Sequence, residues 1–225
     1  MKNLKDCLYE PFKKWAQTGA VWIYSDPHFS DIESYCFRFG CNVNDPNINN
    51  RVIEFDKEQI KSINKEVTKN DTIIFLGDIG NIECIKSIRG YKVLITGNHD
   101  RGLSYYKEVF NEVYDGPLMI NDRIILSHEP IKPLPSYMFN IHGHDHSGTD
   151  FMNIVPKYFD CDIICHELKD VALTAMKMDN CRYLNCCAEW IGYSPVNLSS
   201  IIKSGILKNI KNIHKYHIDN RNNDK

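Results

Sequence analysis

The sequence lacks a charge excess of either sign, and it lacks any long apolar run. Its 27 lysine and arginine residues nearly balance 29 aspartate and glutamate residues, which leaves a formal net charge of -2 over 225 residues. A protein that binds a long polyanion usually presents a basic face, so this balance argues against long nucleic acid as a partner. No window approaches the roughly eighteen apolar residues of a membrane span, and charged residues interrupt the N-terminal segment. We therefore expect neither a membrane anchor nor a signal peptide.

A disulfide pattern is also missing. The nine cysteines are odd in number and scattered through a chain long enough to bury a sizeable core. This usage predicts reduced thiols that pack as small apolar residues in a cytoplasmic protein. Cys161 and Cys165 lie beside His166, but no second ligand pair with zinc-finger spacing accompanies them, so a zinc site is the weaker interpretation. Cys186 and Cys187 fall on neighbouring positions of an expected strand, which favours packing over metal binding.

The first half of the chain alternates apolar strand patterns with helical patterns. Short apolar runs at 20–24, 72–76 and 91–96 predict buried strands, and the apolar spacing over 54–67 predicts a helix between the first two. Residues 31–50 have no reliable period, so we expect a long ordered loop there. Alternation of this kind is typical of an α/β fold.

The second half predicts further strands joined by tight turns. We expect these strands near 118–120, 123–127, 138–142 and 182–189, and a helix through Ile202. Residues 1–207 are then a single α/β domain, within which residues 148–180 form an insertion at the rim of the site. Residues 208–225 are polar, contain few anchoring apolar residues, and should fray.

Five of the expected strands end in loops with side chains that bind metals. Carboxylate, amide and imidazole donors in this mixture suit two divalent ions such as manganese, iron, zinc or nickel better than calcium. Donors two residues apart on an extended chain point to the same side, so each pair can approach one ion. A carboxylate with two oxygens, such as Asp78, can bridge two ions about 3.5 to 4 Å apart. The candidate ligands, in chain order, are Asp26, His28, Asp78, Asn98, His128, His144 and His146, with His99 beside them.

The order of these motifs resembles the calcineurin-like metallophosphoesterases. The chain contains Asp-x-His at Asp26, Gly-Asp at Asp78, Gly-Asn-His-Asp at 97–100, a histidine at His128, and Gly-His-x-His ending at His146. The closing Tyr-x-Pro-Val-x-Leu at 193–198 is similar to the end of small prokaryotic members. The resemblance implies a two-sheet β-sandwich flanked by helices in four layers.

The resemblance also implies a role for each ligand. One metal would take Asp26, His28, Asp78 and His146, and the other would take Asp78, Asn98, His128 and His144, so that Asp78 is the bridge. The ions, most simply manganese, would provide a bridging hydroxide that attacks phosphorus in line and would stabilise the transition state.

The residues around His99 follow from the same resemblance. His99 would stand near the leaving-group oxygen, and Asp100 would orient the loop that carries it. Many relatives have an acid three residues after the Gly-Asp aspartate to pair with this histidine, whereas this chain has Asn81, which cannot supply the charge. Arg101 and Arg38 are candidates for binding phosphate oxygens.

We therefore expect a metal-dependent hydrolase that acts on a small phosphate ester, with a slight preference for diesters over monoesters. One alternative is a nuclease of the same family, which the absence of basic stripes weakens. The other is a catalytically silent scaffold or assembly subunit. A silent relative should have lost ligands or the catalytic histidine, and this chain has all of them.

Overall fold

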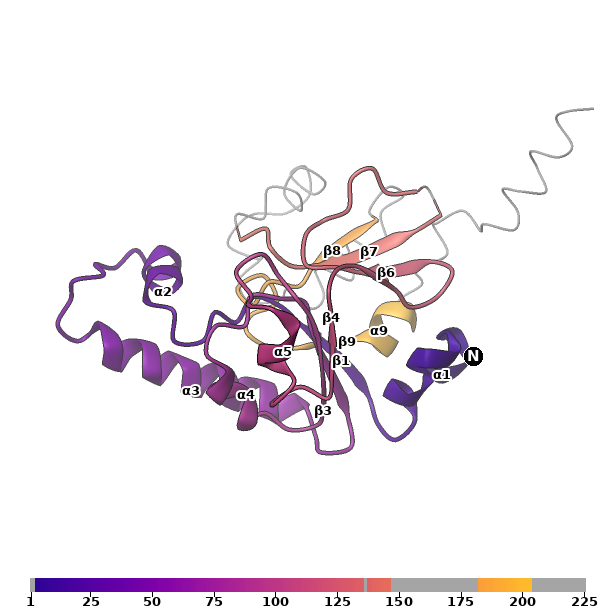
Figure 1. Ribbon diagram of the computed structural model, residues 1–225, viewed down its shortest axis with the longest axis horizontal. Coiled ribbons are helices and arrows are strands. Elements are labelled where there is room, and N and C mark those ends of the chain that lie inside the picture. Colours follow the sequence, from indigo (N-terminus) through magenta and orange to yellow (C-terminus); the bar gives the residue numbers. More distant parts are fainter. Residues whose placement is uncertain (1–2, 136, 147–181, 204–225) are drawn as a thin grey trace, which may run out of the picture.

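The computed structural model describes residues 3–135, 137–146 and 182–203. The expected insertion at 148–180, the polar tail at 208–225 and the cluster of Cys161, Cys165 and His166 lie outside the described residues. The described strands form two mixed sheets, and helices accompany them (Figure 1). The α/β class predicted from the sequence is confirmed at this level.

The larger sheet has five strands in the order β4-β3-β2-β1-β9. β1 to β4 are parallel to one another, and β9 pairs antiparallel with β1. Strand β2 is buried at all four positions, as expected for a central parallel strand covered on both faces. The strands are β1 (Val21–Tyr24), β2 (Thr72–Phe75), β3 (Tyr91–Ile95), β4 (Glu112–Tyr114) and β9 (Val196–Asn197).

The smaller sheet has four strands in the order β5-β6-β7-β8. β6, β7 and β8 are parallel, and β5 pairs antiparallel with β6. The strands are β5 (Leu118–Met119), β6 (Ile124–Leu126), β7 (Phe139–His142) and β8 (Tyr183–Asn185).

One apolar cluster joins the two sheets. Ile23 and Ile74 of the larger sheet belong to the same core as Leu126 and Ile141 of the smaller sheet, and all four are fully buried. Burying an aliphatic side chain of this size contributes about 1.5 to 3 kcal/mol. The sheets are therefore held at a fixed spacing, and so are the loops at their ends.

The helices lie around this core, with α3, α4 and α5 on one side of the larger sheet (Figure 1). Within the described residues, no helix is long and apolar enough to cross a membrane. The helices are α1 (Leu4–Cys7), the 3-10 helix η1 (Glu10–Ala16), α2 (Ile32–Phe39), α3 (Ile48–Glu66), α4 (Ile82–Lys86), α5 (Leu103–Tyr106) and α9 (Leu198–Lys203).

The prediction of a long loop over 31–50 is wrong, because this segment contains α2 and the start of α3. The side chain of Asp31 caps α2 by accepting a hydrogen bond from the Ser34 amide at 3.1 Å, and Gly40 ends the helix in the left-handed conformation. The apolar residues of α2 have helical spacing and pack with Ile48 and Val52 of α3. Helix α3 thus begins six residues before the predicted start at 54.

The strand expected over 182–189 is too long. β8 ends at Asn185, and turns follow from Ala188. Cys186 and Cys187 are both fully buried, which agrees with a packing role.

Candidate metal centre

The predicted ligands all follow the carboxyl ends of parallel strands. Asp26 and His28 follow β1, and Asp78 follows β2. His128 follows β6 of the other sheet, and His144 and His146 follow β7. Open α/β sheets hold their ligands at this end of the strands. The two sheets therefore present their polar loops to a common site.

Two carboxylates and two imidazoles converge in a first group. The Nε2 atoms of His28 and His146 lie 3.2 Å apart. His146 Nε2 is 3.4 Å from Asp26 Oδ1, and His28 Nε2 is 3.6 Å from Asp78 Oδ2. Among the described residues, the buried Asp26 Oδ1 has no hydrogen-bond partner. A buried carboxylate oxygen without a hydrogen bond, with an imidazole nitrogen 3.4 Å away, fits the chemistry of a cation site.

A second group forms around Asn98. Its Oδ1 lies 2.7 Å from His128 Nε2 and 3.0 Å from His144 Nδ1, and these two nitrogens are 3.2 Å apart. His128 Nε2 is also 3.6 Å from Asp78 Oδ2. Asp78 Oδ2 is therefore equally distant from one nitrogen of each group. Asp26, His28 and His146, and likewise Asp26, Asp78 and His128, have donor atoms close enough together to hold an ion.

Neighbouring acceptors fix the imidazole rings. His128 Nδ1 lies 2.7 Å from the carbonyl oxygen of Leu76, which can only accept, so Nδ1 carries the hydrogen. Nε2 then presents a lone pair to the second group. His28 Nδ1 is 3.2 Å from Asp31 Oδ2, which leaves its Nε2 for the first group in the same way.

Glu189 completes this arrangement, and the sequence interpretation did not find it. Its Oε1 pairs with His146 Nδ1, so the ring presents Nε2 to Asp26. Its Oε2 lies 3.5 Å from Arg38 Nη2. Glu189 is in the turns after β8, 43 residues from His146 in sequence, so no local spacing indicated the contact.

Burial and neighbouring charges together shift the pKa values of these groups in different directions. Burial raises the pKa of the Asp78 carboxyl, and the nearby Asp26 adds to the shift. Burial acts the same way on Asp26, but interactions with His146 and His128 outweigh it and hold that pKa below its ordinary value. Burial by itself lowers the pKa of His146, but Asp26 and Glu189 raise it to about 10. Buried negative charge thus attracts a positive charge at this point, which a metal ion can supply.

Four of the predicted ligands have a strained backbone. Asp26, His28, Asp78 and His144 have φ values of 54°, 47°, 53° and 66°. Such conformations cost on the order of 1 to 3 kcal/mol each and persist where the surrounding structure imposes them, commonly at functional sites. The strain is concentrated at residues that the sequence analysis selected for chemistry.

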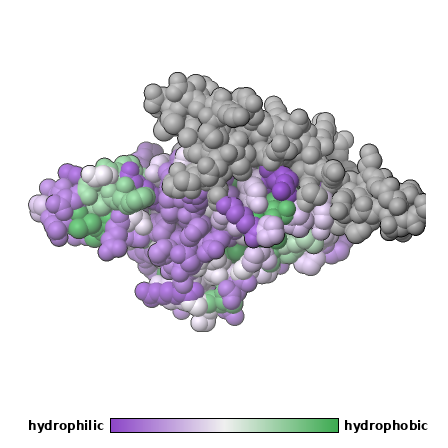
Figure 2. All heavy atoms as spheres, turned by 90° about the horizontal axis from the view of Figure 1, so that it is seen from above, coloured by the Kyte–Doolittle hydropathy of each residue, from purple (hydrophilic) through white to green (hydrophobic). Residues whose placement is uncertain are grey.

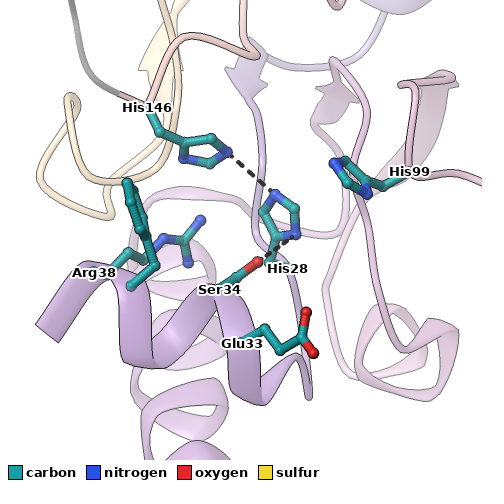
Figure 3. A pocket seen from close by; sticks show the side chains of 7 residues that line it. His28, Glu33, Ser34, Arg38, His99 and His146 are labelled. Carbon is teal, nitrogen blue, oxygen red and sulfur yellow. Dashed lines mark hydrogen bonds between the residues drawn. The ribbon is translucent and has the colours of Figure 1, made fainter. Parts of the chain in front are cut away.

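His99 lies beside the centre without joining either group. Its ring stands 5.8 Å from the ring of His28, edge to face, and its side chain forms no hydrogen bond with the described residues. His99, His28 and His146 line one cavity, and Figure 3 shows their rings around it, with Glu33, Ser34 and Arg38 along α2. The imidazole of His99 is free to contact a ligand.

Asp100 holds loops together. Its Oδ2 accepts the amide hydrogens of Asp78 and Gly97, and its Oδ1 accepts from the Ile79 amide and from the Tyr106 hydroxyl at 2.7 Å. All of these contacts are to the protein, so Asp100 acts as a positioning residue.

Asn81 does not contact His99 through any hydrogen bond in the described structure. Its Oδ1 caps α4 by accepting the Glu83 amide hydrogen at 3.1 Å, and its Nδ2 lies 3.2 Å from Ser30 Oγ. In this structure Asn81 therefore acts as a helix cap.

The two arginines differ in how much of their hydrogen-bonding capacity the protein uses. Arg38 donates from Nη2 to the Asp26 carbonyl at 2.6 Å and from Nη1 to the Pro27 carbonyl at 3.3 Å, so it supports the loop after β1. Arg101 stacks over the ring of Tyr105 at 4.5 Å and lines a second cavity with His99. Arg101 thus has its guanidinium available for an anion, whereas Arg38 has two donors engaged.

His142 takes no part in either group. It is buried in β7, where Nδ1 lies 2.8 Å from the Gly143 carbonyl oxygen and the ring packs against Tyr183.

Comparisons with known proteins give a fold and no family. No family model matches the sequence, and no curated protein matches it. A protein of unknown function from Aquifex aeolicus is similar in structure, with a TM-score of 0.54 and 23% identity over 82% of this chain and 98% of its own. The nuclease MPE of Pseudomonas putida matches with a TM-score of 0.33 and 20% identity, over 56% of this chain and 61% of its own. The Aquifex protein shows that the fold occurs elsewhere.

Proposed function

We propose that the protein is a metal-dependent phosphoesterase of the calcineurin-like type, with its two sheets and helices in the four-layer arrangement of that family. The observation that carries the proposal is the position of Asp78. Its Oδ2 lies 3.6 Å from His28 Nε2 in one group and 3.6 Å from His128 Nε2 in the other. A carboxylate shared in this way is what a site for two neighbouring ions requires.

Each group supplies donors suited to a divalent ion. Asp26, His28, Asp78 and His146 would hold one ion, and Asp78, Asn98, His128 and His144 would hold the other. Oxygen and imidazole donors without thiolate favour manganese, iron, zinc or nickel, and manganese is our first choice. When bound, such ions ionise water near neutral pH and neutralise charge on phosphoryl oxygens.

The residues around the centre have distinct tasks. His99 would donate a proton or a hydrogen bond to the departing oxygen, since its imidazole faces the cavity without a protein partner among the described residues. Asp100 keeps the His99 loop and the Asp78 loop together through the Gly97 and Asp78 amides. Arg101 would bind a further anionic oxygen.

Separate cavities next to the two ligand groups favour a diester. A cavity of about 250 Å³ opens at His28 and His146, and another of about 420 Å³ opens at Asn98 and His128. A diester has two substituents on phosphorus, and each can enter one cavity. A monoester would use one of them.

The test combines metal analysis with a substrate panel. Purified protein equilibrated with excess manganese should retain about two ions per chain and should hydrolyse bis(p-nitrophenyl) phosphate faster than p-nitrophenyl phosphate. Asp6→Asn is the matched control for changes of site carboxylates, because Asp6 is an exposed residue of α1. A protein that retains no manganese, or that retains it and cleaves no ester of the panel, would contradict the proposal.

A further inference from the structure

Helix α2 carries three aromatic residues, and one of them packs against no other aromatic ring among the described residues. The ring of Tyr35 lies 5.5 Å from Phe55 of α3, and the ring of Phe39 lies 5.1 Å from Phe55. Phe37 makes no ring contact with the described residues and is 78% exposed. Figure 2 shows hydrophobic residues gathered at the end of the molecule that holds α2 and the start of α3. Packing within the fold accounts for Tyr35 and Phe39, but not for Phe37.

The position of Phe37 gives it another use. It lines the cavity of about 250 Å³ together with His28, His99 and His146. The remaining wall is polar and comes from Glu33, Ser34 and Arg38 of the same helix (Figure 3). Phe37 is therefore the apolar part of a cavity whose other end is the candidate metal centre.

We propose that Phe37 stacks against a planar aromatic group of the substrate, so that the site selects phosphate esters that carry a nucleobase or an aryl ring. The inference rests on the proposed phosphoesterase function. If the phosphate is held near His28 and His146, the ester group of the substrate fills this cavity and lies against α2. The phenyl ring of Phe37 offers a flat apolar face there, which favours a planar ring. Stacking of one base on an aromatic side chain changes affinity by roughly tenfold or more.

Binding of two probes tests the proposal directly. Adenosine 5′-monophosphate and ribose 5-phosphate share the phosphate and the sugar, and only the first has a ring that can stack. With manganese-loaded protein we expect the adenosine compound to bind about tenfold more tightly. Phe37→Ala should remove this preference, and Phe37→Trp should keep it and report the stacked ring by fluorescence quenching. Phe39→Ala is the matched control on the same helix and should retain the preference.

The outcomes separate this proposal from the phosphoesterase proposal. Equal binding of the two probes, binding of neither, or an unchanged preference in Phe37→Ala would overturn the role of Phe37. Hydrolysis of bis(p-nitrophenyl) phosphate is measured in parallel and decides the activity by itself. A protein that cleaves this ester but binds both probes equally has the activity without the stacking site. A protein that prefers the adenosine compound through Phe37 but cleaves nothing has the stacking site without the activity.

Discussion

Asp78→Asn separates the two roles that Asp78 has in the structure. Asp78 Oδ1 accepts the amide hydrogen of His99 at 3.0 Å, and Oδ2 faces His28 and His128. An asparagine has one oxygen and one NH₂ group in the same shape. If its oxygen keeps the His99 contact, the NH₂ group faces the candidate ions and cannot bind them. The variant should therefore lose the bridge between the two groups while the loop stays in place.

The structure predicts that Asp78→Asn changes the free energy of unfolding with opposite signs in the absence and in the presence of metal. The raised pKa of Asp78 means that the metal-free folded state disfavours its ionised form, so that form lowers stability above the ordinary pKa of the carboxyl. Replacing it by an uncharged amide should raise the free energy of unfolding at pH 7 by about 1 kcal/mol, the scale of one uncompensated polar group. For a chain of this size that is about 2 to 4 °C in Tm.

With manganese bound, the wild-type protein should be more stable than Asp78→Asn. At a concentration of about 100 times Kd, a ligand stabilises the wild-type protein by about 2.7 kcal/mol, or roughly 5 to 10 °C. If Asp78→Asn weakens manganese binding about 100-fold, the same manganese concentration stabilises the variant by only about 0.4 kcal/mol, or roughly 1 °C. The assay is thermal unfolding followed by circular dichroism with and without manganese, with Asp6→Asn as the control. An equal manganese shift in Asp78→Asn, or a metal-free variant less stable than wild type, would refute the reasoning.

Three further changes test residues that act on the centre or on the fold. His99→Ala should bind manganese as wild type does and lower kcat by about 10² to 10⁴-fold, and an equal loss for leaving groups of every basicity would argue against proton donation. Glu189→Ala should weaken manganese binding by about 10 to 100-fold in a metal titration, because it frees the ring of His146. Asp71→Asn should lower the free energy of unfolding at pH 7 by about 1 to 2 kcal/mol in urea. Burial raises the pKa of Asp71, but hydrogen bonds to backbone amides outweigh it and hold the pKa low, so the difference should vanish as the pH falls below about 4.

The sequence predicted most of the strands because apolar runs in the middle of a parallel sheet are short, continuous and bounded by polar loops. Strand β2 is such a run, and its predicted span exceeds the observed one by Leu76 alone. The candidate ligands were found for a related reason, since the end of a buried strand is where a polar cluster is conspicuous. Their assignment as metal ligands stays a prediction.

The parts that the sequence did not predict depend on contacts between distant segments or on competing signals. Helix α2 has helical apolar spacing and the cap Asp31, but the turn formers that follow it obscured the pattern. Glu189 reaches His146 through the pairing of β7 with β8, which no spacing in the chain encodes. The use of Arg38 as a support for the Asp26 loop likewise depends on where α2 packs.

The glycines within the motifs explain why the five motifs together indicate a metal site, whereas each motif alone is weak evidence for one. A Cβ on Gly97 would lie 2.2 Å from Asp78 Oδ1, and one on Gly77 would lie 2.5 Å from His128 Nδ1. A Cβ on Gly143 would lie 2.2 Å from Asp26 Oδ2. Each glycine therefore makes room for a candidate ligand that belongs to a different motif. The loops interlock, so a side chain at any one of these glycines displaces a ligand that lies elsewhere in the sequence, and the ordered set acts as one structural unit.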